Sequence, residues 1–178
     1  MLILSKGDLT ALDQLFSRYR QRIFAFFRRR TSDLAGAEEL TQETFIALLR
    51  AAPRYQPRAP FRTYLFAVAF RILRADRRKR TFRSFFFSSA VNTERVPAVA
   101  KNEDRILWLR QALSRLDMVD REILLLREFE QLSYAEIGEI LRIPLNTVRS
   151  RLFRARVALR GHLEPSLSKD SVAVGELS

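Results

Sequence analysis

The chain lacks cysteine and contains a single histidine, His162. Without cysteine it can form neither a disulfide framework nor a thiolate metal site. His162 lies near the end of the last predicted helix, so we interpret it as a helix-end residue rather than a metal ligand or a base. A glycine-rich phosphate loop, a Ser/His/Asp set and a metal-binding cluster are also missing from the sequence. These absences argue against an enzyme, and we expect no metal and no cofactor.

Long hydrophobic runs are missing too. No apolar run approaches the ~18 residues of a membrane span. Residues 1–4 are apolar but too few for a signal sequence, and Lys6 and Asp8 follow at once. We therefore expect a cytoplasmic protein with no membrane insertion and no small-molecule substrate.

Positive charge is what the chain has in excess. It carries 32 Lys and Arg against 20 Asp and Glu, a net charge of +12 over 178 residues. That balance favours a polyanionic partner, with nucleic acid first and an anionic membrane surface second. Because 47% of the residues are hydrophobic, the chain can build real cores, either as one domain or as two small ones.

The stretch 132–156 is typical of two short helices joined by a turn. Pro144 interrupts the helical pattern, because its ring fixes φ and removes a backbone donor. Ahead of it, an apolar side is formed by Ala135, Ile137, Gly138, Ile140 and Leu141, while Glu136 and Glu139 face water. Beyond it, one helical stripe is formed by Val148, Leu152, Ala155 and Leu159. Gly138 would let the two helices approach closely, and a buried Val148 would lock them together.

The second of these helices is strongly cationic on its other side. From Arg142 to Arg160 there are six arginines and no acidic residue. The side away from the stripe carries Thr147, Ser150, Arg151 and Arg154, flanked by Arg149 and Arg156. A helix-turn-helix needs this asymmetry if its second helix enters a DNA major groove. An ordinary helical hairpin with a basic exposed face is the alternative.

Two further helices are predicted in the first part of the chain. Asp8 can cap one that runs to about Arg30, and Ser32 or Asp33 can cap a second that runs to about Ala51. The inner side of the second helix is predicted to be Leu34, Ala37, Leu40, Thr44 and Leu48. Its other side is an acidic strip, formed by Glu38, Glu39, Gln42 and Glu43. The acidic strip is either a solvated face or a docking surface for a basic partner.

A proline-rich loop at 52–60 precedes a helix predicted from Phe61 to about Arg80. One apolar side of this helix has Leu65, Val68, Ala69 and Ile72, and another has Phe66, Phe70 and Leu73. Many arginines lie between them, which suits a groove that stacks unpaired bases and neutralises phosphates. The competing interpretation, that both apolar sides are core, is favoured for most positions. Arg62, Thr63 and Tyr64 at the helix entry are the better candidates for exposed contacts.

We therefore predict an all-α fold of two small helical domains joined by a flexible linker. The first domain spans 1–81, the linker with its aromatic cluster Phe82–Phe87 spans 82–101, the second domain spans 102–163, and a disordered tail spans 164–178. In the second domain, one helix is marked by Ile106, Leu109, Leu113 and Leu116, and Asp117 can cap the next. With the helix-turn-helix they make a four-helix unit.

Two blocks of the sequence carry a resemblance. The first is AEELTQETFIALL (37–49), followed by the proline loop and FRTYL (61–65). The second runs from Ala112 to Arg160 and contains SYAEI, PLNTV and SRLFRAR. Together, in this order and with a linker between them, they resemble a bacterial RNA polymerase sigma factor of the extracytoplasmic-function (ECF) type, a class of the sigma-70 family.

The resemblance implies roles for matched positions. The residues of this chain that contact core polymerase would be Glu38, Glu39, Gln42 and Glu43. Contacts to the melted strand of the -10 element would come from Arg62, Thr63, Tyr64, Arg71, Arg74, Arg77 and Arg78. Contacts to the -35 duplex would come from Arg142, Asn146, Thr147, Arg149, Ser150, Arg151 and Arg154, with Arg151 and Arg154 placed to reach base edges or phosphates. An anti-sigma factor commonly covers the same surfaces.

The chain also departs from the family pattern at three positions. Many relatives have tryptophan at Tyr64, asparagine near Arg71 and glycine at Arg142. If the helix-helix turn needs a left-handed residue, Arg142 costs roughly 1–2 kcal/mol there.

The sequence thus predicts a factor that gives core RNA polymerase its promoter specificity and has no catalysis of its own. Two alternatives stay open. A stand-alone helix-turn-helix regulator binding an operator would leave the acidic strip without a role. A basic protein that coats RNA or membrane would bind with steep salt dependence and no sequence preference.

Overall fold

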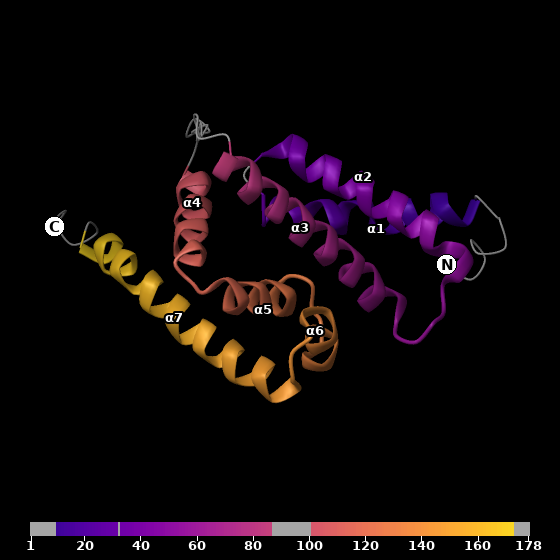
Figure 1. Ribbon diagram of the computed structural model, residues 1–178. Helices are drawn as coiled ribbons and strands as arrows, with labels where there is room; N and C mark the ends of the chain where they lie inside the picture. The colour runs from indigo at the N-terminus through magenta and orange to yellow at the C-terminus, as the bar shows by residue number, and fades with distance from the viewer. Residues whose placement is uncertain (1–9, 32, 87–100, 173–178) are drawn as a thin grey trace. The chain divides into compact units, whose positions relative to one another are not determined.

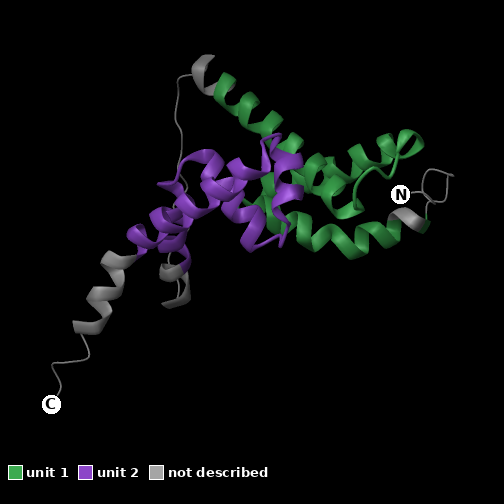
Figure 2. Cartoon of the chain, turned by 90° about the horizontal axis from the view of Figure 1, so that it is seen from below, with its two compact units in different colours: residues 1–91 green, residues 92–178 purple. Residues whose placement is uncertain are grey.

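The computed structural model describes residues 10–31, 33–86 and 101–172, and every regular element in them is helical. The chain divides into two compact units, residues 1–91 and 92–178, which Figure 2 colours separately. The elements are α1 (Thr10–Arg28), α2 (Leu34–Ala51), the 3-10 turn η2 (Ala52–Arg54), α3 (Phe61–Phe86), α4 (Lys101–Ser114), α5 (Met118–Glu128), α6 (Tyr134–Leu141) and α7 (Leu145–Val172). The predicted all-α fold class is confirmed.

In the first unit, α1, α2 and α3 lie side by side around an aromatic core (Figure 1). Phe26 and Phe27 of α1 are fully buried, and Phe26 packs on Phe66 of α3 with ring centroids 5.7 Å apart. Burial of each such side chain is worth roughly 1.5–3 kcal/mol. The buried face of α2 contains Ala37, Leu40, Thr44 and Leu48, as predicted. Leu34 was predicted there and is 57% exposed, because it lies in the first turn, at the edge of the packed face.

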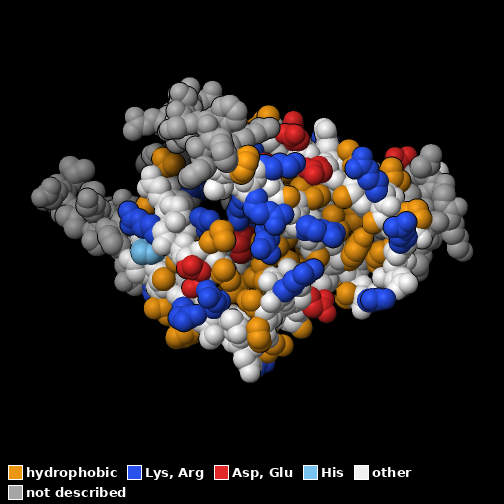
Figure 3. Space-filling view, in the orientation of Figure 1, with side chains coloured by type: hydrophobic (Ala, Val, Ile, Leu, Met, Phe, Trp, Pro, Cys, Tyr) orange, Lys and Arg blue, Asp and Glu red, His pale blue; other side chains and the backbone are white. Residues whose placement is uncertain are grey.

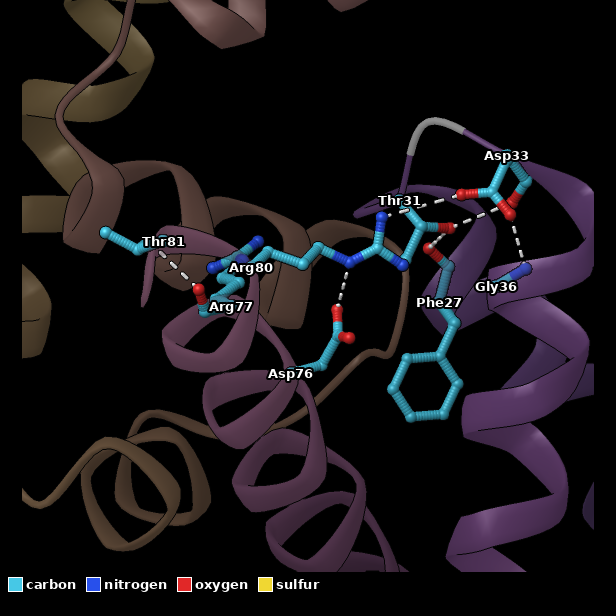
Figure 4. A network of polar contacts seen from close by, with 8 residues as sticks. All are labelled: Phe27, Thr31, Asp33, Gly36, Asp76, Arg77, Arg80 and Thr81. Atoms are coloured by element: carbon cyan, nitrogen blue, oxygen red, sulfur yellow. Dashed lines mark hydrogen bonds and ion pairs between the residues drawn. The ribbon is translucent and has the colours of Figure 1, made fainter. Parts of the chain in front are cut away.

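Asp33 begins α2 as its N-cap, accepting a hydrogen bond from the backbone N–H of Gly36. The same carboxylate lies 3.7 Å from Nη1 of Arg80, whose Nε donates to Asp76 at 2.8 Å (Figure 4). Thr81 Oγ1 donates to the carbonyl of Arg77 one turn earlier. The Arg80–Asp33 contact ties the later turns of α3 to the start of α2, and the other two stabilise α3 itself.

The helix α3 ends at Phe86, beyond the end predicted near Arg80. The prediction used apolar periodicity, and that signal stops where the helix leaves the core: Phe82 is 65% exposed. The Arg80–Asp76 pair at i,i+4 spacing stabilises the helix at the predicted end. Of the predicted 82–101 linker, residues 87–100 lie outside the described part of the chain, and so does Phe87 of the aromatic cluster.

In the second unit, α5, α6 and α7 pack around a core to which each contributes. Ile123, Leu126, Ile137 and Val148 are fully buried in it. Asp117 caps α5, as predicted, by accepting hydrogen bonds from the backbone N–H groups of Val119 and Asp120. The four helices of the second unit are α4 to α7.

A capping box begins α6: Ser133 and Glu136 each accept a hydrogen bond from the other's backbone N–H. Ala135, which we expected on the apolar side, is exposed. It lies in the first turn of an eight-residue helix, where only Ile137, Gly138 and Ile140 turn inward enough to be buried.

The last helix, α7, continues to Val172, past the end predicted near Leu163. Pro165 removes one backbone donor, and a helix can continue past a proline at the cost of that hydrogen bond and a local bend. His162 is therefore not at a helix end, contrary to our interpretation, and its side chain is half-buried within α7. The domain boundaries stay predictions.

Candidate nucleic-acid interface

The turn between α6 and α7 has the geometry that a helix-turn-helix requires. Arg142 ends α6 in the left-handed conformation, with φ 58° and ψ 48°, and its backbone N–H donates to the carbonyl of Gly138. The N–H of Ile143 donates to the same carbonyl at 3.1 Å. A Cβ at Gly138 would lie 2.9 Å from Ile143 O and 3.8 Å from Val148 Cγ2. Glycine is thus required by the turn itself, at the carbonyl of Ile143, and not by the approach of α7, since 3.8 Å to Val148 is an ordinary van der Waals contact.

The inner face of α7 matches its predicted stripe. Val148, Leu152 and Ala155 are at most 1% exposed, and Leu159 is half-buried. Packing of this stripe fixes which side of the helix faces outward. The exposed side chains on that outward face are Asn146, Arg149, Ser150, Phe153, Arg154, Val157 and Arg160.

Phe153 is 69% exposed, in the middle of this cationic face. Our sequence reasoning missed it as a candidate, although it lies off the 148/152/155/159 stripe and this alone predicts exposure. Thr147 is half-buried, and its carbonyl accepts a hydrogen bond from Ser150 Oγ at 3.2 Å.

Two of the arginines on α7 bind carboxylates of α5. Arg151 Nη1 donates to Asp120 Oδ1 at 2.8 Å and to Asp117 Oδ1 at 3.1 Å. Arg156 donates to Glu128 Oε1 from Nη2 at 2.6 Å and from Nε at 3.1 Å. The side-chain hydrogen bond to Asp120 raises the pKa of Arg151, and the backbone N–H of Asp120 is the main cause that lowers the pKa of Asp117. Both partners of the Arg151–Asp117 pair therefore stay charged.

For the other arginines of the stretch, the described residues offer no such partner. Among the side chains that the structure describes, no carboxylate pairs with Arg142, Arg149, Arg154 or Arg160, and all four are exposed. In Figure 3, Lys and Arg side chains on the visible surface lie among apolar side chains. These four cations are the ones available to a polyanion.

The predicted acidic strip on α2 is fully on the surface: Glu38, Glu39, Gln42 and Glu43 are all exposed. It continues into two apolar residues that the sequence reasoning did not include, Ile46 at 47% and Leu49 at 39% exposure. The spacing 39, 42, 43, 46, 49 places them on one helical face. The strip is therefore acidic at one end and apolar at the other.

At the entry to α3, the expectation that Thr63 is exposed is wrong, since only 2% of it is accessible. The apolar arc of α3 is wide enough to enclose this position. Arg62 and Tyr64 are half-buried. Further along α3, Arg71, Arg74 and Arg78 are exposed and Arg77 is half-buried.

Tyr64 belongs to an aromatic cluster that sequence reasoning did not assemble. Tyr55, from the loop after η2, lies with its ring centroid 4.9 Å from Tyr64 and 6.5 Å from Phe61. Tyr19 of α1 completes the aromatic cluster, 5.4 Å from Phe61. Burial, with a smaller contribution from Tyr64, raises the pKa of Tyr55, so the phenol stays neutral at physiological pH. Each of these four rings is half-buried and presents part of its surface.

Over the described residues, no group of three or more His, Asp or Glu side chains is placed to hold a metal ion. No helix there is both long and apolar enough to cross a membrane.

Comparison with known families assigns both units. Residues 15–83 match the model of Sigma-70 region 2, and residues 106–159 match that of Sigma-70, region 4. The chain is 31% identical over 175 residues to RNA polymerase sigma-H factor of Pseudomonas aeruginosa, covering 91% of each chain. It is 32% identical over 167 residues to the ECF RNA polymerase sigma factor SigC of Mycobacterium tuberculosis, covering 90% of this chain and 88% of that one.

Two solved structures share the fold. The sigma factor RpoE of Bartonella quintana, in complex with the anti-sigma factor NepR, gives a TM-score of 0.74 at 20% identity, over 85% of this chain and 96% of that one. CnrH, in complex with the cytosolic domain of CnrY, gives 0.71 at 22% identity, over 91% and 93%. Since region 2 and region 4 occur here in the family's order, and relatives over 30% identical align along most of their length, the chain belongs to the sigma-70 family of RNA polymerase sigma factors, in its ECF class.

Proposed function

We propose that this sigma factor directs core RNA polymerase to promoters by binding the -35 duplex with its second unit and the melted -10 strand with its first. Sigma factors are transcription initiation factors and not themselves catalysts. The observation that carries the proposal is the outward face of α7, where exposed arginines without carboxylate partners flank Ser150 and Phe153 on a helix fixed by the α6–α7 turn.

The α7 face suits a DNA major groove. Its first turns carry Asn146, Arg149 and Ser150 on the surface, where helix N-termini and short polar side chains bond phosphates. Arg154 lies one turn further and can reach a base edge, for which arginine's preferred partner is guanine. Phe153 beside it offers an apolar contact to a thymine methyl group.

The aromatic cluster of Tyr19, Tyr55, Phe61 and Tyr64 suits unpaired bases. Half-buried rings are held by one another while part of each stays open to stack on a base, a contact worth roughly 1–3 kcal/mol per base. Arg71, Arg74, Arg77 and Arg78 on α3 supply cations for the backbone of the strand. The -10 contacts therefore involve rings from α1 and the proline loop as well as from α3.

The acidic strip of α2 is the surface for core polymerase. Exposed carboxylates in a chain of net charge +12 would repel DNA, so this face suits a protein partner. Ile46 and Leu49 add an apolar end that gains from burial. Seated on polymerase, two weak DNA sites act together, because linking them raises their effective concentration.

An anti-sigma factor is the further partner we propose. CnrH and RpoE were each solved with a protein partner, and RpoE's is an anti-sigma factor. A competitor of this kind would cover the apolar end of the acidic strip and the α7 face, and so block polymerase and DNA together.

Footprinting with and without core polymerase tests the proposal. We expect protection of two promoter elements that depends on polymerase. Strong protection of a palindrome by the chain alone would instead show a stand-alone helix-turn-helix regulator. Protection without sequence preference would show a general polyanion-binding protein.

A further inference from the structure

Arg151 lies on the DNA-facing helix but its guanidinium is engaged within the protein. Nη1 donates to Asp120 Oδ1 at 2.8 Å and to Asp117 Oδ1 at 3.1 Å. The side chain of Asp120 is 16% exposed and that of Arg151 is 31% exposed, so the contact is partly shielded from water. Asp117 Oδ1 also caps α5, so the same oxygen that begins α5 accepts from α7.

This position differs from its neighbours on α7. Arg149 and Arg154, two residues before it and three after, are exposed and pair with no carboxylate among the described side chains. With two carboxylates beside it, Arg151 brings no net positive charge to a phosphate. A role in reading or neutralising DNA would require it to give up both partners first.

The apolar packing of α7 indicates what an ion pair between α5 and α7 can add. The buried stripe of α7 is formed by Val148, Leu152 and Ala155, which are all apolar. Packing of this stripe sets which side of α7 faces outward, but apolar packing has little directional preference and leaves small rotations of α7 about its axis. A hydrogen-bonded ion pair is directional and selects one rotation.

We propose that Arg151 is a positioning residue: held by Asp117 and Asp120, it fixes the rotation of α7 and so determines where Ser150, Phe153 and Arg154 meet the -35 duplex. The inference deepens the proposed function and rests on it. It assigns promoter recognition in part to Asp120, a residue of α5 that faces α7 rather than DNA.

Asp120→Asn gives the sharpest test, because positioning and simple electrostatics predict opposite signs. Removing a negative charge from a DNA-binding domain should strengthen binding. If Asp120 positions α7, the holoenzyme should instead bind promoter duplex with its preferred -35 element about two- to fivefold more weakly, the range that a partly exposed ion pair supports. The control Glu139→Gln removes an exposed charge from α6 and should leave affinity equal or slightly raised.

Salt dependence separates positioning from phosphate binding. Arg151→Ala should weaken holoenzyme binding while the slope of log affinity against log salt stays that of the wild type. Arg154→Ala or Arg149→Ala should make the slope shallower by about 0.9 for each phosphate that the variant no longer neutralises. The double variant Arg151→Ala/Asp120→Asn should bind no more weakly than Arg151→Ala alone. All measurements are made well below the thermal unfolding transition of each full-length variant, so that loss of folded protein does not contribute.

Each of the following results would overturn the inference. Asp120→Asn could bind more tightly, which would mean that freed Arg151 contacts phosphate. Arg151→Ala could flatten the salt slope, or it could relax preference at a single base pair, which would make it a direct contact. If the wild-type holoenzyme showed no -35 preference, both the positioning role and the proposed function would fail. If the wild type shows that preference and Asp120→Asn binds equally well, only the positioning role fails.

Discussion

The helices α2 and α7 are built alike and present opposite charges. Each buries an apolar stripe against its own unit and leaves one polar face exposed. On α2 that face is acidic, with Glu38, Glu39 and Glu43, whereas on α7 it is cationic, with Arg149 and Arg154. The difference teaches that burial places a helix while the charge of its outward face sets which partner it can take, which in the proposed function is protein for α2 and nucleic acid for α7.

Reversing charge on the acidic face is the most severe way to break this comparison. Glu39 is exposed, so Glu39→Lys should leave the fold intact and abolish co-purification with core polymerase, because a cation would replace a carboxylate in the middle of the proposed docking face. Asp13→Lys, at an exposed site on α1, makes the same charge change away from the acidic strip and should leave the complex in place. Survival of the complex in Glu39→Lys would make the acidic strip a solvated face.

The cationic face depends on the turn that orients it. Gly138→Ala would place a Cβ 2.9 Å from Ile143 O, which we expect to lower the free energy of unfolding by about 1–3 kcal/mol. Gly161→Ala is the matched control on α7, because nothing lies within 4 Å of its Cβ position. It should raise stability by up to about 1 kcal/mol through helix propensity. Urea unfolding of both variants measures the difference, and equal effects would contradict the close approach at the turn.

Removing a single cation from α7 sharpens the comparison at residue level. Arg154→Ala should weaken holoenzyme binding to the preferred -35 element by about 1–3 kcal/mol if the arginine reads a base. Arg110→Ala removes an exposed arginine of α4 and should change little. Competition between promoter duplexes mutated at each -35 position measures this. Equal losses on every sequence would show that Arg154 touches only phosphate.

The smallest expected effect is at the turn residue itself. Arg142→Gly should relieve the left-handed conformation and stabilise the second unit by about 1 kcal/mol. The same change should weaken DNA binding slightly and flatten its salt slope, because an exposed cation is removed. Thermal unfolding should therefore show higher stability, while affinity measured at several salt concentrations should be lower. Tighter DNA binding by the glycine variant would show that Arg142 contributes no contact.

Local signals made most of the fold predictable. The caps at Asp33 and Asp117 and the stripe at Val148, Leu152 and Ala155 follow from helical spacing and short polar side chains, and the structure confirms them. The glycine that relatives have at Arg142 left open whether the turn is left-handed, and φ 58° shows that it is.

Tertiary contacts were what the sequence did not reveal. Arg151 finds its carboxylates 31 and 34 residues away, which no helical period connects. Thr63 is buried because the arc of α3 that faces α1 and α2 is wider than one stripe. The aromatic cluster draws Tyr19, Tyr55 and Tyr64 from three separate segments, so each looked isolated in the sequence.

Run-off transcription with purified core polymerase on a promoter library tests the central claim most directly. We predict that the chain selects promoters sharing both a -35 and a -10 element, and that changes on the α7 face shift preference at -35 alone. Transcription without any shared element, or a chain that fails to bind core polymerase yet selects a DNA target unaided, would contradict the account.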